Sequence, residues 1–168
     1  MTPLPTGLGG TNVVAWRLDR DIYAPDWDSG EGAYRVGGRW NSKGIRAVYC
    51  SADPSTAILE VAVHKTFETL DRVPHVMTSL VIANPADVHV VNEADIPDKS
   101  WLRFVTPTPA QQAFGDALLG RHKFIAIPSA VSPRSWNVLF VKSQAGGAYS
   151  LVAQEPFALD KRLLPPKP

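Results

Sequence analysis

The sequence has few of the features that mark several large classes of protein. Its single cysteine, Cys50, excludes a disulfide within the chain and a metal site built from several cysteines. The formal charge is only +1, so the charge balance does not predict direct binding to nucleic acid or to a membrane surface. No apolar run approaches the roughly 18 residues that span a membrane, and the start, MTPLPTGLGG, does not read as a signal peptide. We therefore expect a cytoplasmic protein.

The common metal and phosphate motifs are also lacking. The four histidines have no metal-ligand spacing, and there is no HExxH. Neither GxGxxG nor GxxxxGK[ST] occurs, so the two common phosphate loops are not predicted. A GxSxG elbow is missing too, which argues against a serine hydrolase. We expect no metal cofactor.

Proline, in contrast, is abundant, and the fifteen prolines divide the chain into short elements. Runs of β-branched and aromatic residues predict strands. These runs lie at 12–18, 45–50, 76–82, 87–91, 124–128 and 137–142, with a last short strand at 157–159. Because strands and helices do not alternate regularly, the pattern favours a single α+β domain over a doubly wound sheet. We expect a flexible N-terminal tail at 1–11, the domain at 12–164 and a C-terminal tail at 165–168.

Two helices are predicted from their capping residues. The first runs over 54–67, with Asp53 as the N-cap before a proline. The second runs over 108–120, where Thr108 begins the helix, Gln111 completes a capping box, and the helix ends at a glycine.

The connection over 19–44 is long for a compact domain, and such loops are usually functional or disordered. Its segment GGRWNSKG contains several glycines, Gly38 among them, that allow a ligand to approach the backbone. Arg39 can hold an anion, and Asn41 can hydrogen-bond a sugar or an amide. Trp40 can pack against a ring or close a pocket. The alternative is a hairpin-like turn with an exposed Arg39 and with Trp40 folded onto the core.

Two charged residues lie in apolar surroundings. Glu60 interrupts AILEVAV, a stretch that predicts a helix buried nearly all round. A carboxylate there is costly unless it is paired, is hydrogen-bonded or faces a cavity; the alternative is that it reaches the surface. Arg17 shares a strand face with Val13 and Ala15. It points either to solvent or into a cleft, where its guanidinium offers a fixed fork for phosphate.

Two hydroxyl residues are weaker candidates. Tyr49 ends a predicted strand, and its hydroxyl is expected near the start of the Glu60 helix, although tyrosine is more often a core residue. Ser129 follows a strand in IPSAV, where serine is usually a turn residue. His64 and Lys65 are expected on the surface.

Together these residues resemble the RES domain, the toxin half of the bacterial Xre–RES toxin–antitoxin systems. The family is named for an Arg, a Glu and a Ser, which here would be Arg17, Glu60 and Ser129. The block GGRWNSKGIRAVYCSADPSTAILE resembles the most distinctive part of the family, and PAQQAFGDALL, IPSAVSPRSWNVLF and FALDKRLL resemble later parts. One stretch departs from the family pattern, because VKSQAGGAYS stands where an Asn-Pro and then a His tend to follow.

The resemblance implies an ADP-ribosyltransferase-like split β-sheet flanked by helices, with NAD bound in its cleft as the substrate. It implies the toxin of a type II toxin–antitoxin system that degrades NAD by cleaving the nicotinamide–ribose bond, through hydrolysis or phosphorolysis. Transfer of ADP-ribose to a protein stays open, as does a nucleotide-binding module without catalysis. The implied partner is an Xre-type helix-turn-helix antitoxin, in a complex that could be of higher order.

The resemblance also implies roles for the candidate residues. The catalytic candidates are Glu60, Arg17, Tyr49 and Ser129. The candidates for binding NAD or shaping its loop are Arg39, Gly38, Trp40 and Asn41. Glu60 would stabilise positive charge on the ribose, and Ser129 would orient Glu60 or the ribose.

Overall fold

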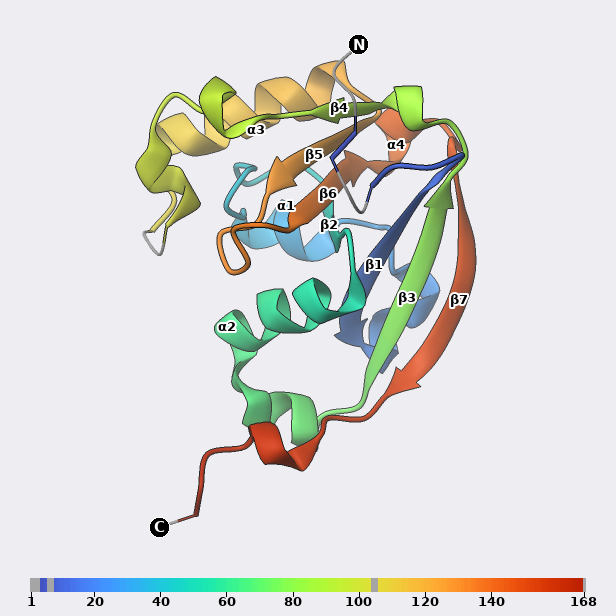
Figure 1. Ribbon diagram of the computed structural model, residues 1–168, viewed down its shortest axis with the longest axis vertical. Helices are drawn as coiled ribbons and strands as arrows, with labels where there is room; N and C mark the ends of the chain where they lie inside the picture. Colours follow the sequence, from blue (N-terminus) through green and yellow to red (C-terminus); the bar gives the residue numbers. More distant parts are fainter. Residues whose placement is uncertain (1–3, 6–7, 104–105, 168) are drawn as a thin grey trace.

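The computed structural model describes residues 4–5, 8–103 and 106–167. Within these residues, one seven-stranded sheet has the order β4-β5-β6-β2-β1-β3-β7 (Figure 1). The strands are β1 (Val13–Arg20), β2 (Ala47–Ser51), β3 (His75–Ile82), β4 (Val88–Val90), β5 (Phe124–Pro128), β6 (Trp136–Val141) and β7 (Tyr149–Phe157). The α-helices are α1 (Glu31–Val36), α2 (Pro54–Arg72), α3 (Pro109–Arg121) and α4 (Lys142–Ala145). Short 3-10 helices lie at Asp21–Asp26, Pro85–Asp87, Glu93–Asp95, Lys99–Leu102 and Lys161–Leu163.

The sheet divides between β1 and β2. These strands align through one pair, Trp16 opposite Ser51, whereas β1 pairs with β3 along its whole length. The sheet therefore opens into two parts, β4-β5-β6-β2 and β1-β3-β7, which diverge in Figure 1. All pairs are antiparallel except β4 with β5. The predicted α+β domain with a split sheet flanked by helices is confirmed.

Six of the predicted strands match β1 to β6 within a few residues, but the last one is wrong in extent. β7 begins at Tyr149 and ends at Phe157, where the sequence predicted a strand to start. It lies at the edge of the sheet and pairs with β3 alone, so most of its side chains are exposed. An edge strand of this kind can carry residues such as Glu155 and Pro156, which weaken the sequence signal for a strand.

The start of α2 is as predicted, but its burial is not. The Asp53 side chain accepts a hydrogen bond from the Thr56 amide at 2.8 Å, which caps the helix. The helix continues past the predicted end at 67, with a break in its helical backbone angles at Thr66. Leu59 and Val63 are 38% and 54% exposed, so the helix is not buried all round. Its apolar outer face has no covering element in the described residues.

The second predicted helix is α3, and it differs from the prediction at both ends. Thr108 Oγ1 accepts from the Gln111 amide at 3.2 Å, which confirms the N-cap. The Gln111 side chain is fully buried and donates instead to the Trp101 carbonyl, so no capping box forms. Gly120 lies inside the helix, which ends at Arg121.

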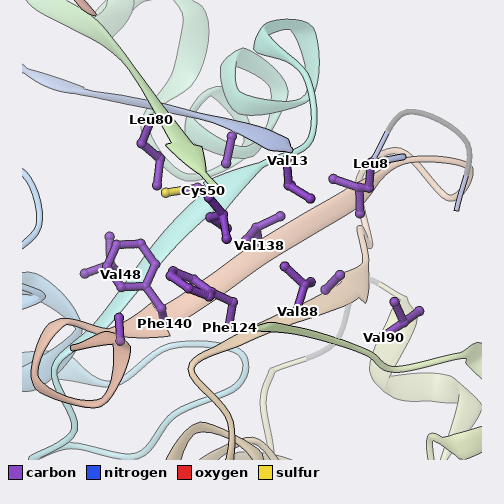
Figure 2. Packing of buried hydrophobic residues seen from close by; sticks show 14 of the residues in the cluster. Leu8, Val13, Val48, Cys50, Leu80, Val88, Val90, Phe124, Val138 and Phe140 are labelled. Carbon is purple, nitrogen blue, oxygen red and sulfur yellow. The ribbon is translucent and has the colours of Figure 1, made fainter. Parts of the chain in front are cut away.

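Among the described residues, two clusters of buried apolar side chains pack on opposite faces of the part formed by β4, β5, β6 and β2, and a third joins Leu18 of β1 and Met77 of β3 to Leu70 of α2. One cluster includes Val48, Phe124 and Phe140 and is shown in Figure 2. Leu8, within the predicted tail, belongs to this cluster and is only 1% exposed. A second cluster, which contains Trp40, lies on the opposite face under α3.

Candidate active site

A pocket of about 390 Å³ lies at the division of the sheet. β1, β2, α1, α2 and the loop before β2 all contribute to its walls. Six of the eight predicted site residues line it: Arg17, Gly38, Arg39, Trp40, Tyr49 and Glu60. Asn41 and Ser129 are buried behind these walls. A pocket of this size is typical of sites for small ligands and cofactors.

The Glu60 carboxylate is held by two donors from separate elements. Its Oε1 accepts from Ser129 Oγ at 2.7 Å and from Asn137 Nδ2 at 2.6 Å. The Ser129 oxygen accepts from the amides of Val131 and Ser132, so its own proton is directed to Glu60. Within the described residues no hydrogen bond reaches Glu60 Oε2. The pocket therefore contains a carboxylate that is fixed at one oxygen.

Asn137 is a site residue that the sequence reasoning missed. It lies in β6, opposite Ser51 of β2, and also lines the pocket. Ser51 Oγ donates to Asn137 Oδ1 at 3.1 Å, and both side chains are buried. A polar side chain at the start of the apolar run NVLFV is the signal that could have indicated it, because such a residue must find partners inside the sheet.

Arg17 joins the two parts of the sheet. Its Nη1 donates to the Tyr49 carbonyl of β2 at 2.9 Å, and its Nη2 donates to Asp19 Oδ2 at 2.6 Å. Arg17 thus spans the gap beside the Trp16–Ser51 pair and lines the pocket. Of the two predicted orientations, the structure shows the one into the cleft.

The side chains of Trp40 and Asn41 point into the protein. Trp40 is 1% exposed and packs edge-on against Trp101, with 6.4 Å between ring centroids. The Asn41 side chain is fully buried and donates to the carbonyls of Ala33 and Ser42. These two residues therefore shape the loop from within, and for Trp40 the alternative of packing on the core is the one observed.

The Tyr49 hydroxyl is held at this loop by two hydrogen bonds. It donates to Asn41 Oδ1 at 2.7 Å and accepts from the Trp40 amide at 3.0 Å. Burial raises the pKa of the Tyr49 hydroxyl well above its ordinary value, so it stays protonated. A Cβ on Gly38 would lie 2.7 Å from both oxygens, so the glycine leaves room for this hydrogen bond. Tyr49 nevertheless lines the pocket.

Three cations surround the pocket in addition to its carboxylate. Arg39 lines one wall, where its Nη1 donates to the carbonyls of Trp101 and Arg103. Lys65 and His64 line the rim and are exposed, so these residues, predicted as plain surface, lie at the pocket. Lys65 Nζ is 3.9 Å from Asp19, the partner of Arg17. Arg17 and Lys65 share Asp19 as a partner, and Glu60 is also negative, so these four side chains and Arg39 together carry a net charge of about +1, which favours an anionic ligand.

Helix α3 supports the pocket loop from behind. Gln112 Nε2 donates to the Gly38 carbonyl at 2.9 Å, and the Ser42 amide donates to Asp116 Oδ1 at 3.0 Å. Gly115 meets the backbone of Trp40 so closely that a Cβ would lie 1.9 Å from its carbonyl oxygen. The shape of the loop therefore depends on α3.

The described residues contain no group of three or more His, Cys, Asp or Glu side chains placed to hold a metal ion. No helix among those residues is long and apolar enough to cross a membrane. A carboxylate and several cations at the gap of a split α+β sheet define a protein with an anion-favouring ligand pocket. The RES domain profile matches residues 14–160, and the chain belongs to the RES domain family.

Relatives match most of the chain. A protein named Toxin Res from Pseudomonas putida is 33% identical over 157 residues, which cover 90% of this chain and 99% of that protein. A Sphingobium protein named Prs ADP-ribosylating toxin is 29% identical over 135 residues, 74% of this chain and 79% of its own. The crystal structure of the M. tuberculosis MbcT–MbcA toxin–antitoxin complex contains a chain with a TM-score of 0.69 and 17% identity, covering 88% of this chain and 85% of that one. This structural match supports the fold.

Proposed function

We propose that this protein is the toxin of a type II toxin–antitoxin system and that it consumes NAD by breaking the nicotinamide–ribose bond. The observation that carries the proposal is the fixed Glu60 carboxylate at the wall of a pocket with several cations. Membership of the RES family and the names of the relatives support the biological role.

The chemistry follows from the charge that develops during cleavage. Nicotinamide leaves with the bonding electron pair, which makes the ribose carbon oxocarbenium-like. Glu60 is suited to stabilise this positive charge because its Oε1 is held by Ser129 while its other oxygen remains available. The oxygen of water or of inorganic phosphate then bonds to the same carbon. The acceptor loses a proton, and this completes hydrolysis or phosphorolysis.

The other pocket residues are assigned by charge and shape. Arg17 and Arg39 lie where they can bind the pyrophosphate or the ribose, since guanidinium groups form strong hydrogen bonds to phosphate. The Tyr49 ring can flank the nicotinamide, while its hydroxyl keeps the loop in shape. NAD is the substrate in this account, and no step uses a metal ion.

The name of the Sphingobium relative, an ADP-ribosylating toxin, favours a second activity, the transfer of ADP-ribose, for which we propose a protein as the acceptor. Bond cleavage would be the same, and a nucleophilic side chain of the target would replace water or phosphate. The two activities therefore share Glu60 and differ only in the acceptor. A search for the acceptor decides between them.

We further propose an Xre-type helix-turn-helix antitoxin as the partner and the cytoplasm as the compartment. Support for an antitoxin comes from the structural neighbour, which was solved as a toxin–antitoxin complex. The proposed partner should co-purify with this chain when both are expressed, and it should suppress NAD consumption.

Expression in bacteria tests the proposal. Wild-type protein should lower cellular NAD and stop growth, whereas Glu60→Gln, which keeps the size of the side chain, should do neither at equal soluble expression. ADP-ribose phosphate among the products would indicate phosphorolysis, and free ADP-ribose would indicate hydrolysis. Labelled ADP-ribose on a protein would indicate transfer. Unchanged NAD together with unlabelled protein in cells that express the wild type would contradict both activities.

A further inference from the structure

Asn137 occupies a rigid position beside the proposed catalytic carboxylate. It lies in β6, between Ser51 of β2 and Ile127 of β5, in the central part of the sheet. Asn137 is only 7% exposed, and its Nδ2 lies 2.6 Å from Glu60 Oε1. A donor on a central strand is held more firmly than one on a surface loop.

The neighbours of Asn137 fix the orientation of its amide. Glu60 as a carboxylate can only accept, so the NH₂ group must face it. Ser51 Oγ donates to the opposite atom, Asn137 Oδ1, at 3.1 Å. The two contacts agree on one orientation, and exchanging the amide oxygen and nitrogen would place an oxygen against the Glu60 oxygen.

We propose that Asn137 is a positioning residue that, with Ser129, holds Glu60 in its catalytic orientation. This inference rests on the proposed function, because it assigns Asn137 a part in the same reaction. The two donors approach one carboxylate oxygen from different elements, the turn after β5 and the strand β6. They therefore restrict the rotation of a side chain on α2, and Oε2 is the oxygen left for the substrate.

The rival explanation is structural: Asn137 could serve only to tie β6 to β2 through Ser51. Two variants separate these roles. Asn137→Asp keeps the size of the side chain and an oxygen that accepts from Ser51, but it replaces the donor to Glu60 by an acceptor. Ser51→Ala removes the tie between the strands and leaves the amide donor to Glu60 in place.

The kinetic test measures nicotinamide release from NAD. Positioning predicts a roughly 10- to 100-fold lower kcat in Asn137→Asp, with KM changed about twofold at most, because a hydrogen bond to a charged group is lost. Asn137→Ala, which adds no charge, should lower kcat in the same range. Ser51→Ala should lower kcat clearly less than either Asn137 variant, because the amide donor to Glu60 remains and only one of its two orienting contacts is lost. Wild-type kcat in both Asn137 variants, or an equal loss in Ser51→Ala, would overturn the inference.

A second readout does not depend on activity. In Asn137→Asp two carboxylates would meet at the position of the 2.6 Å contact, and like charges at this distance repel. The unfolding temperature of this variant, relative to the wild type, should therefore fall as pH is raised from 4 to 7, and Ser51→Ala should show no such trend. A pH-independent difference would contradict the contact itself. Absence of NAD turnover in the wild type would refute the proposed function, while this thermal measurement would still test the contact.

Discussion

Replacing Gly115 by alanine should move the loop that forms one wall of the pocket. The backbone of α3 meets the backbone of Trp40 here, and a Cβ would lie 1.9 Å from the Trp40 oxygen and 2.6 Å from its carbonyl carbon. Comfortable contacts between nonbonded heavy atoms are about 3.5 Å. Neither partner is a side chain that could rotate away, so the helix or the loop must shift.

The expected destabilisation follows from this overlap. Overpacking of a tight contact costs about 1–3 kcal/mol. A shift also weakens the Gln112–Gly38 and Ser42–Asp116 hydrogen bonds, each contributing about 1 kcal/mol. The better helix propensity of alanine relative to glycine offsets about 1 kcal/mol of this loss. If both hydrogen bonds are lost, the net loss is about 2–4 kcal/mol, which for a chain of this size lowers Tm by roughly 4–16 °C.

Thermal unfolding followed by circular dichroism measures this effect, and Gly120→Ala is the matched control. Gly120 lies in the same helix, but a Cβ there meets nothing within 4 Å. We expect the control to melt at or slightly above the wild-type temperature. The reasoning is refuted if Gly115→Ala melts within about 2 °C of the wild type, or if both variants lose the same stability.

Three further predictions concern other parts of the molecule. Thr66 has φ 67° and ψ 154°, a backbone region that favours glycine. Thr66→Gly should therefore stabilise the folded protein by about 1 kcal/mol and raise Tm by roughly 2–4 °C. An unchanged or lower Tm would argue against strain at this residue. Tyr49→Phe should lower the free energy of unfolding in urea by about 2 kcal/mol, because the Asn41 oxygen and a backbone amide lose a buried partner. An unfolding curve equal to that of the wild type, together with a lower kcat, would instead assign the hydroxyl to the chemistry. Burial, and then the stacked His89 ring, lower the pKa of His122 in the folded protein. The unfolded state therefore binds the proton more tightly, and stability falls as pH drops below about 6.5. Between pH 7.5 and 5.5 the unfolding midpoint should fall more in the wild type than in His122→Asn, and an equal fall would contradict this.

Local signals predicted much of the fold. Asp53 and Thr108 cap their helices as expected, because a cap depends on residues that are adjacent in sequence. The β-branched runs of the inner strands were also recognisable, since both faces of these strands are covered. β7 was not, because an edge strand buries little and its stability comes from pairing with β3, which is distant in sequence.

The site was predicted only in part, because some of its residues show local signals while their contacts join positions that are distant in sequence. Residue types and surroundings singled out Glu60 and Arg17, and the resemblance added Ser129, whose contact with Glu60 spans 69 positions in sequence. The inward direction of Trp40 depends on the close approach of α3 at Gly115, which no local pattern encodes. Asn137 could be noticed as a polar residue in an apolar run, but its role was hidden because its partner Glu60 is 77 positions away in the sequence, on α2.

Nicotinamide release by the purified protein is the most direct test of the central claim that Glu60 supports cleavage of NAD. Wild-type protein and Glu60→Gln, at equal concentration and with matching circular dichroism spectra, are incubated with NAD with and without phosphate, and products are identified by mass spectrometry. The account predicts nicotinamide from the wild type in at least one condition and at least about a 100-fold slower release from Glu60→Gln. Equal rates for the two proteins would contradict the role of Glu60, and intact NAD with the wild type, also after candidate acceptor proteins are added, would contradict the proposed activity.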